Sequence, residues 1–407
     1  MTCARESKPN VSNLTPATPT LDIYRVGGSL RDELLGRPHA DQDFVVLHSS
    51  DQELRQAFPA ARRVGHRHGA VYFVHGAEYS LSRHPDIRSD LKARDLTINA
   101  LAEDQHGRMH ALDQTWEDLR HKVLRQVRDA NFFQDPLRVF RTARLAASLP
   151  GFTVAPELEA LLVRVGQASR LDGLSPERVG QETIKACRGS QPGHFLRLLA
   201  RTGTLRPWFQ ELALADSVPA GPPGSHGHFL LEHTARVMDA LAGHELQVWM
   251  GLCHDLGKTL TPQSRWPRHH DHDQAGVGLA LRLAERLRLP RSFALAGQRA
   301  ARWHMVAGNY DLLRPGTKVD LLRNLRTREN IRDLFSLVKA DQDRDHTLSA
   351  LQDLDTLLSV KLPAEHRNLG RRSGVVLRGL QAQALISSSR KRGRSHALSA
   401  RIQGKQP

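Results

Sequence analysis

Residues 23–47 read IYRVGGSLRDELLGRPHADQDFVVL, and this stretch decides the fold that we predict for the N-terminal part of the chain. Two short apolar runs flank a helix-like segment that opens at Gly27 and Gly28. A strand that turns on glycines into a helix lets the backbone approach a phosphate closely and presents the free amides of the helix N-terminus. Because a Gly-Gly after a strand is more often an ordinary tight turn, the turn alone does not predict a function.

Two carboxylates follow this turn and change its interpretation. Asp41 and Asp43 lead directly into the apolar run 44–47, and the alternation of a strand places both on one face. Two like charges at this spacing repel each other unless a cation lies between them. Glu78 lies in another strand-like segment that could pair beside them. A bare D-x-D would more often be a solvated turn, but next to the glycine turn it predicts a two-metal Mg²⁺ site, which can activate an attacking hydroxyl and stabilise leaving pyrophosphate.

Beyond this stretch, the spacing of the apolar residues changes from strand-like to helical. Short apolar runs alternate with helix-like stretches as far as Leu101, which predicts a small unit with a mixed sheet. After Asn131 the spacing is helical, and a Gly/Pro-rich interval at 218–227 predicts a boundary. The predicted class is α+β. We expect a disordered leader at 1–20, a mixed-sheet head at 21–125, a helical neck and body at 126–217, a second helical domain at 225–350, and a basic, partly disordered tail at 351–407.

The composition is that of a globular protein with an anionic partner. Lys and Arg number 58 against 43 Asp and Glu, a net charge of +15 over 407 residues, and most of the cations are Arg. Guanidinium groups suit bidentate phosphate and base contacts, although a GC-rich genome also raises Arg content. Three cysteines in no paired spacing indicate a reducing compartment. No apolar run approaches the ~18 residues of a membrane span, so we expect a cytoplasmic protein without a membrane partner. No pattern predicts an oligomeric state.

Five ordered motifs carry a resemblance to a known family. VGGSLRDELLG with HADQDFVV resembles the active-site signature of the polymerase-β-like nucleotidyltransferase superfamily. The order and spacing of further motifs are similar to those of bacterial class II tRNA nucleotidyltransferases, the CCA-adding enzymes. These motifs are KARDLTINALA at 92–102, DQTWEDL at 113–119, QDPLRVFRTAR at 134–144 and SPERVGQE at 175–182. The resemblance runs from about residue 23 to 345 and implies a polymerase-β-like head followed by an all-α body.

The resemblance implies a role for each motif. Asp41 and Asp43 would bind the catalytic Mg²⁺ ions, with Glu78 as a third carboxylate. The triphosphate would be contacted by Gly27, Gly28 and Arg31, and the ribose by Arg94, Asp95 and Asn99. The family usually has two arginines before this Asp, and here the first is Ala93, so we expect a weaker ribose or phosphate contact.

The same resemblance implies an amino-acid template for the base. Asp135 and Arg138 match the pair that reads the pairing edge of cytosine, whose amino donor and two acceptors fit a carboxylate and a guanidinium. Without the resemblance, a surface i,i+3 ion pair would be the safer interpretation. Gln134 replaces the acid usually found before Asp135. Arg141 and Arg178 would support the base or the triphosphate.

The family contains enzymes that add all three nucleotides and enzymes that add only the two cytidines. Adenosine addition is associated with a flexible Gly-rich loop between the carboxylate motif and the ribose motif. Here only the sixteen residues YSLSRHPDIRSDLKAR separate Glu78 from Asp95, and none is glycine. We therefore predict a CC-adding enzyme that uses CTP, with full CCA addition from CTP and ATP as the alternative, and tRNA as the partner in both.

A second constellation lies in the C-terminal half. His233 is followed by adjacent His254 and Asp255, and later by Asp341, an order that resembles the HD metal-dependent phosphohydrolase superfamily. The resemblance implies these four residues as ligands of Mn²⁺, Ni²⁺ or Co²⁺, with His272 and His304 lining the site. A metal-bound water acidified there would attack a phosphate ester, such as a 2′,3′-cyclic phosphate. Alternatively, the domain binds metal and only supports RNA docking.

Three further interpretations stay open at this point. A bacterial poly(A) polymerase shares the head motifs, but the HD domain argues against it, and long A tails would identify one. A hydrolase with a decayed head, or an RNA-binding module, is disfavoured by the intact Asp41-x-Asp43 pair.

Overall fold

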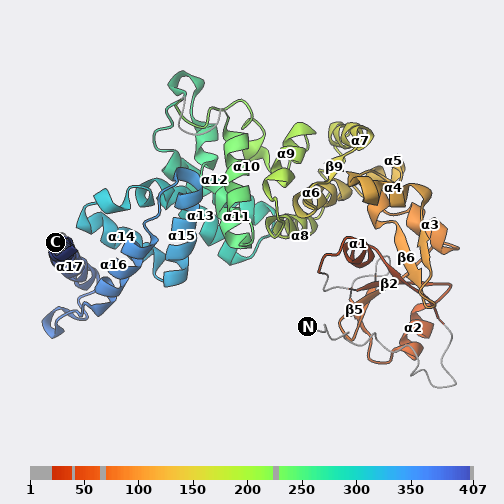
Figure 1. The fold of residues 1–407 in the computed structure, drawn as a ribbon, viewed down its shortest axis with the longest axis horizontal. Helices are drawn as coiled ribbons and strands as arrows, with labels where there is room; N and C mark the ends of the chain where they lie inside the picture. The colour runs from red at the N-terminus through yellow and green to blue at the C-terminus, as the bar shows by residue number, and fades with distance from the viewer. Residues whose placement is uncertain (1–20, 39–41, 65–69, 223–228, 404–407) are drawn as a thin grey trace. The chain divides into compact units, whose positions relative to one another are not determined.

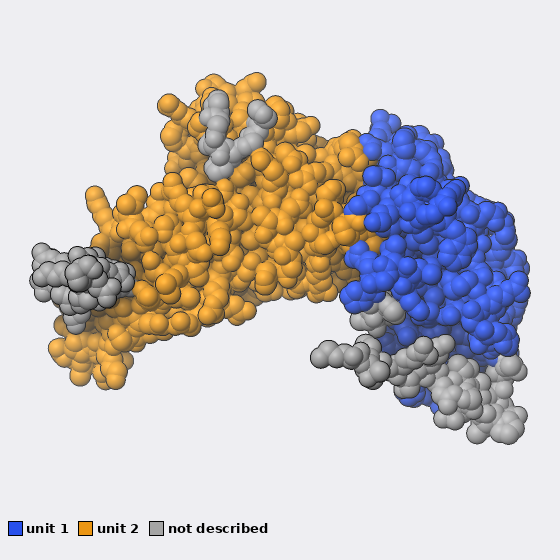
Figure 2. Space-filling view, in the orientation of Figure 1, with its two compact units in different colours: residues 1–142, 151–168 blue, residues 143–150, 169–407 orange. Residues whose placement is uncertain are grey.

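The computed structural model describes residues 21–38, 42–64, 70–222 and 229–403, with side chains as far as residue 389. These residues form two compact units, which are described separately below (Figures 1 and 2). The first unit contains residues up to Thr142 together with 151–168, and the second contains 143–150 and 169–407. The boundary expected at 218–227 therefore lies inside the second unit. The predicted leader lies outside the described residues.

The first unit is built on a seven-stranded mixed sheet (Figure 1). Its strand order is β3-β4-β5-β2-β1-β6-β7, in which β2 and β5 are parallel and the other neighbouring pairs are antiparallel. The strands span β1 Asp22–Val26, β2 Asp43–Leu47, β3 Arg62–Val64, β4 Val71–Val74, β5 Ala77–Leu81, β6 Leu101–Asp104 and β7 Met109–Ala111.

Hydrophobic residues are buried on both faces of this sheet. Val46 packs in a cluster with Leu54 and Tyr72, whereas its neighbour Val45 packs in a different cluster with Leu91. Successive residues of a strand point to opposite faces, so the run FVVL supplies both cores. The continuous apolar run is therefore that of a central strand covered on both sides.

Short helices and turns connect and follow the strands of the first unit. A capping box starts α2: the Ser50 side chain accepts from the Glu53 amide, and the Glu53 side chain accepts from the Ser50 amide. The helices are α1 Gly28–Leu34, α2 Asp51–Ala57, α3 Ile87–Lys92, α4 Asp113–His121, α5 Asp129–Gln134, α6 Arg138–Ser148 and α7 Pro156–Gln167, with a 3₁₀ turn η2 at Thr97–Asn99. The residues of α6 from Ala143 onward belong to the second unit. Two short strands, β8 Val123–Leu124 and β9 Thr153–Val154, pair with each other.

The second unit is helical in every element that the structure describes between residues 169 and 403. Its longer helices are α8 Pro176–Cys187, α9 Gly193–Arg201, α10 Leu230–Ala240, α11 Glu245–Cys253, α12 His272–Arg286, α13 Arg291–Ala307, α14 Pro315–Leu325, α15 Arg328–Gln342, α16 Thr347–Ser359 and α17 Arg371–Gln403. A 3₁₀ turn, η4 at Leu256–Leu260, follows α11. The backbone of α17 continues through the segment expected to be a mobile tail, and Leu385 anchors it as a buried residue.

The mixed-sheet unit followed by helices confirms the predicted α+β class. Among the described helices, none combines the length and the apolar character that a bilayer span requires.

Candidate functional site

Gly27 brings the first candidate site together. Its φ of +81° is a conformation that L side chains rarely adopt, and it forms the junction between β1 and α1. A side-chain carbon built at Gly27 would lie 3.6 Å from Arg94 Nη1 and 3.9 Å from Asp43 Oδ2. Three motifs separated in sequence, namely the glycine turn, the carboxylate strand and the 92–102 segment, therefore converge at this position.

The carboxylates predicted for Mg²⁺ lie on neighbouring parallel strands. Asp43 at the start of β2 is in register with Glu78 on β5, and the Glu78 amide donates to Gln42 O at 3.0 Å. Residues in register on adjacent strands present their side chains to the same face. An all-oxygen donor set of this kind fits Mg²⁺. Asp41 lies outside the described residues.

A chain of buried polar contacts connects the triphosphate and ribose motifs. Arg31 Nη1 donates to Asn99 Oδ1 at 2.6 Å, and Asn99 Nδ2 donates to Asp95 Oδ1 at 3.0 Å. Arg141 Nε donates to Asp95 Oδ2 at 3.0 Å. Burial alone would raise the pKa of Asp95, but Arg141, Asn99 and the Leu96 amide together hold it well below its ordinary value. Asp95 is therefore an ionised acceptor with a fixed orientation.

Arg138, predicted as half of the base template, is docked on main-chain carbonyls. Its Nη1 donates to Arg94 O at 3.1 Å and its Nη2 donates to Ala93 O at 2.7 Å. The Arg138 amide donates to Asp135 O at 3.1 Å, which places the two template residues at the junction of α5 and α6.

Asn131 is a residue of this site that the sequence did not indicate. Its Nδ2 donates to Lys92 O at 3.0 Å and to Arg94 O at 2.7 Å, so it holds the same turn that receives Arg138. No motif or spacing marks an Asn on α5 for this role. Arg178, in contrast, lies in the first turn of α8 within the second unit and is exposed there.

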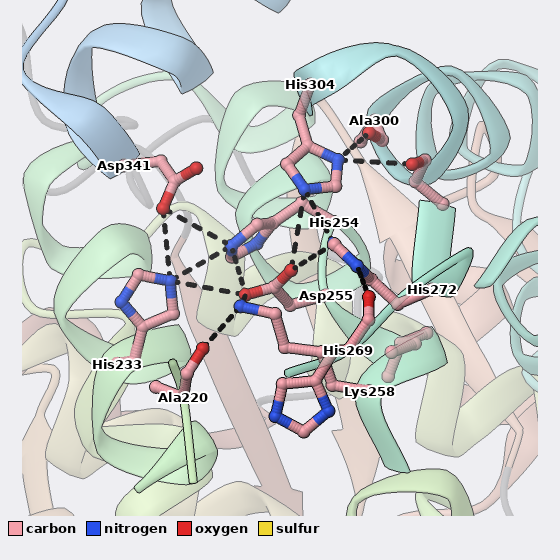
Figure 3. Close-up of polar contacts among 12 residues, drawn as sticks. Ala220, His233, His254, Asp255, Lys258, His269, His272, Ala300, His304 and Asp341 are labelled. Carbon is pink, nitrogen blue, oxygen red and sulfur yellow. Dashed lines mark hydrogen bonds and ion pairs between the residues drawn. The ribbon is translucent and has the colours of Figure 1, made fainter. Parts of the chain in front are cut away.

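A second site is formed inside the second unit by five helices and turns (Figure 3). Each element contributes one or two ionisable side chains. The first and the last of these residues are about a hundred positions apart in the sequence. The residues are His233 on α10, His254 and Asp255 at the end of α11, His272 at the start of α12, His304 on α13 and Asp341 on α15.

Asp255 lies at the centre of this cluster. Its Oδ2 is 3.4 Å from His233 Nε2 and 3.2 Å from His254 Nε2. Its Oδ1 is 3.2 Å from His272 Nε2 and 3.4 Å from His304 Nε2. The carboxylate is buried, and neither oxygen makes a hydrogen bond of satisfactory geometry within the described structure. A buried carboxylate surrounded by imidazoles is the arrangement expected of a metal ligand.

The candidate ligands fall into two groups. His233, His254 and Asp341 form one, and Asp255, His272 and His304 form the other; the potential ligand atoms of each group lie within 4.8 Å of one another. His272 and His304, expected from the sequence to line the site, thus occupy candidate ligand positions beside Asp255. Since Asp255 faces His233 and His254 through its other oxygen, it is a candidate ligand for both groups.

Main-chain carbonyls fix the tautomer of three of these imidazoles. His254 Nδ1 donates to Gly251 O at 2.7 Å, His272 Nδ1 to His269 O at 2.6 Å, and His304 Nδ1 to Ala300 O at 2.9 Å. In the neutral ring this leaves Nε2, which is directed into the cluster, as the nitrogen that can bind a metal. Imidazole and carboxylate together suit a borderline transition metal.

The charges within the cluster are strongly coupled. Burial would lower the pKa of His233, but the adjacent carboxylates of Asp255 and Asp341 raise it to about 9. Burial also opposes ionisation of both aspartates, yet the neighbouring imidazoles hold the pKa of Asp341 below its ordinary value and, together with Lys258, do the same for Asp255. Binding of a cation would displace the proton from His233.

Gly257 permits the close packing on which the second group depends. A side-chain carbon at this position would lie 1.9 Å from His272 O and 2.7 Å from Gly276 N, both main-chain atoms of α12. Only glycine lets α12 approach η4 closely enough for His272 to reach Asp255. The HDLGK sequence therefore carries a packing requirement as well as two ligands.

Comparison with known proteins gives matches along most of the chain. Residues 151–215 match the family model described as "Probable RNA and SrmB- binding site of polymerase A", and residues 230–347 match the HD domain model. A multifunctional CCA protein of Halorhodospira halophila is 37% identical over 327 residues, which cover 75% of this chain and 79% of that protein.

Two solved structures share the fold. The Bacillus stearothermophilus CCA-adding enzyme in complex with CTP has a TM-score of 0.62 and 22% identity, with coverage of 92% of this chain and 95% of that chain. The Thermotoga maritima CCA-adding enzyme complexed with tRNA has a TM-score of 0.60 and 18% identity, with coverage of 90% and 87%.

Proposed function

Because this chain belongs to the class II CCA-adding nucleotidyltransferase family, we propose that it adds C, C and A to the 3′ end of tRNA from CTP and ATP. The observation that carries this proposal is the convergence of Gly27, Asp43 and Arg94 at one position of the head. The relative that establishes the family is a multifunctional CCA protein, which favours full CCA addition over the CC-only activity predicted from the short connection.

In this proposal the carboxylates of the head hold Mg²⁺. Asp43 and Glu78, together with Asp41, would supply the ligands. The ions, when bound, neutralise the triphosphate and the charge that develops on pyrophosphate. Arg31 and the Gly27–Gly28 turn contact the triphosphate, because the backbone can come close there, and Arg94 beside the turn contacts the ribose. The ionised Asp95 and the Asn99 amide, both fixed by their mutual hydrogen bond, orient the ribose hydroxyls.

Base selection would depend on Arg138 and Asp135. Bound CTP requires the Arg138 guanidinium to face the pairing edge of cytosine, and the carbonyls of Ala93 and Arg94 hold that guanidinium at a fixed place. A base with the reversed donor pattern would leave these polar groups unpaired, which costs binding energy. The Arg-rich helical segments, including residues 151–215, would hold the tRNA acceptor arm through phosphate contacts.

CC-only addition remains the second candidate because of one observation. Only residues 82–86 connect β5 to α3, and none of them is glycine. A connection of this length offers no room for the flexible Gly-rich loop associated with adenosine addition.

An incorporation assay decides between the two candidates. Purified enzyme is incubated with tRNA that lacks its 3′ CCA, with CTP alone, ATP alone, or both. Efficient addition of one A after two C supports the full CCA activity. Arrest at two C in the presence of ATP supports the CC-only activity, and long A tails would instead identify a poly(A) polymerase. The Asp43→Asn variant serves as the control for head-dependent incorporation.

For the second site we infer a metal-dependent phosphohydrolase activity. His233, His254 and Asp341 would hold one ion, and His272 and His304 a second, with Asp255 between them. The chemistry supplied by such ions is the acidification of a bound water for attack on phosphorus. The carbonyls of Gly251, His269 and Ala300 accept from the Nδ1 atoms of His254, His272 and His304, which aligns the rings and leaves Nε2 of each neutral ring as the ligand atom.

This activity is tested with a 2′,3′-cyclic nucleotide and added Mn²⁺, Ni²⁺ or Co²⁺. Hydrolysis that is lost in His254→Ala and in Asp255→Ala supports the proposal. If the wild type is inactive with all three metals, the domain serves RNA docking instead.

A further inference from the structure

Two buried side chains beside the metal cluster are tied to one short segment of the chain. His269 Nε2 donates to Pro219 O at 2.8 Å, and Lys258 Nζ donates to the next carbonyl, Ala220 O, at 2.6 Å. Figure 3 shows Lys258 in contact with both Asp255 and Ala220, and the His269 ring near the Lys258 side chain. The two polar groups are thus held in fixed positions, although neither belongs to the two groups of candidate ligands.

The hydrogen bond to Pro219 determines what His269 can offer a ligand. Because a carbonyl can only accept, Nε2 carries the proton and Nδ1 of the neutral ring is an acceptor. The residue is 9% exposed, and its Nδ1 has no hydrogen-bond partner among the residues that the structure describes. A buried acceptor without a donor costs free energy that a ligand can recover by supplying one.

Lys258 provides the complementary group. Its Nζ lies 2.6 Å from Asp255 Oδ2 and 2.6 Å from Ala220 O. An ammonium has three N–H donors, of which the hydrogen bond to Ala220 O uses one, while the contact with Asp255 is an ion pair. A remaining donor is available to an anionic oxygen close to the metal cluster. The result is a cationic donor and a neutral acceptor that are held by the adjacent carbonyls Ala220 O and Pro219 O.

We propose that Lys258 and His269 form a subsite for a phosphorylated ribose, in which Lys258 donates to a phosphate oxygen and His269 Nδ1 accepts from the adjacent free hydroxyl. The subsite rests on the phosphohydrolase activity proposed above. A phosphate dianion has no proton to offer Nδ1, whereas a nucleoside 2′- or 3′-phosphate carries a hydroxyl on the neighbouring carbon. The subsite therefore favours these monoesters over their deoxy counterparts. A 2′,3′-cyclic phosphate has no such hydroxyl and does not use His269.

Two substitutions separate the acceptor from the structural hydrogen bond. His269→Asn places an amide oxygen near the position of Nδ1, so it keeps an acceptor. His269→Gln places its amide nitrogen near the position of Nε2, so it keeps the donor to Pro219 and loses the acceptor. The neighbouring His270 is exposed, and His270→Gln is the matched control.

The experiment measures binding to the full-length, Mn²⁺-loaded enzyme by calorimetry. The probes are two nonhydrolysable phosphonates, 3′-deoxy-3′-phosphonomethyladenosine and its 2′-deoxy counterpart. The wild type should bind the hydroxyl-bearing probe about 3–10-fold more tightly, the effect of one neutral hydrogen bond. This ratio should fall to about one in His269→Gln, and it should persist in His269→Asn and His270→Gln. Binding of both probes should be lost in His254→Ala, which locates the probes at the metal cluster.

A second readout distinguishes a ligand contact from a structural role. Bound Mn²⁺, determined by elemental analysis, should be equal in the wild type and in both His269 variants. A wild-type ratio of one, an unchanged ratio in His269→Gln, or loss of Mn²⁺ from that variant would overturn the subsite. Hydrolysis of the 2′,3′-cyclic nucleotide by the wild type would in those cases still support the phosphohydrolase activity. Absence of both binding and hydrolysis would refute the two proposals together.

Discussion

Gly257→Ala should damage half of the metal cluster and leave the other half in place. The added carbon would lie 1.9 Å from His272 O, whereas nonbonded contacts are favourable near 3.5 Å, so α12 must move by about 1.5 Å. The atom it meets is main chain, and no side-chain rotation relieves the contact. His272 Nε2, now 3.2 Å from Asp255 Oδ1, would leave ligand distance.

The expected magnitude follows from this geometry. Overpacking of this kind costs about 1–3 kcal/mol. In a unit of this size each kcal/mol lowers the melting temperature by about 2–4 °C, so we expect a decrease of roughly 2–12 °C. His233, His254 and Asp341 come from elements other than α12, and this group should still bind an ion. Bound metal should therefore fall from two equivalents to one.

The assay combines thermal unfolding with elemental analysis of the dialysed, metal-loaded protein. The control is Gly278→Ala on the same helix, where the added carbon meets only the flexible end of Arg282, at 3.2 Å. This variant should keep both equivalents and melt at or slightly above the wild-type temperature, since Ala is the better helix former. CTP incorporation by the head should be unchanged in both variants. If Gly257→Ala retains two equivalents and the wild-type melting temperature, the close approach at Gly257 does not position His272.

Four further outcomes are expected. Asp43→Asn should lower the rate of CTP incorporation by more than about 100-fold, beyond the loss typical of a group that only orients a metal ligand, while the melting temperature stays within about 2 °C. Arg141→Ala should destabilise the first unit by about 1–2 kcal/mol in urea unfolding, less than a fully buried pair would lose because Arg141 is 41% exposed. Because the pKa of Asp95 is depressed in the folded protein, the ionised carboxylate stabilises the fold above its ordinary pKa of 3.8, and this stabilisation is lost as the pH falls. The wild type should therefore lose more stability between pH 6 and pH 3 than Arg141→Ala does. Removal of metal with a chelator should lower the melting temperature of the second unit, Mn²⁺ should restore it, and Asp255→Asn should abolish this recovery; an equal metal response in that variant would show that Asp255 does not bind the ion.

Local sequence patterns were sufficient for much of the head. The apolar runs predict β1, β2, β4 and β5, because each run is long enough for a strand and bounded by turn residues. Ser175 before Pro176 predicts the start of α8, and its hydroxyl accepts the Arg178 amide there. The prediction that Glu78 lies beside the Asp43 strand also depends only on pairing of adjacent strands. In these cases a short segment contains the whole physical cause.

Contacts between distant segments could not be predicted in this way. Asn131 acts on carbonyls 37 and 39 residues away, and nothing in its own neighbourhood indicates them. Strand β9 has only two residues and follows Asn131, after which the sequence shows no strand pattern. It is a strand because it pairs with β8, and not because its residues favour strands. The grouping of His272 and His304 with Asp255 depends on how α12 and α13 pack. Gly257 affects this packing because it has no side chain and so lets α12 come close. Helix α17 is stabilised by burial of Leu385 in a stretch whose composition indicates a polar tail.

Helix α6 contributes to both compact units within one turn. Arg141 bonds to Asp95 inside the first unit, and three residues later Arg144 bonds to Glu182 inside the second at 2.6 Å. Each of these bonds lies inside a single unit, so the loss of either arginine should weaken only the unit that holds its partner.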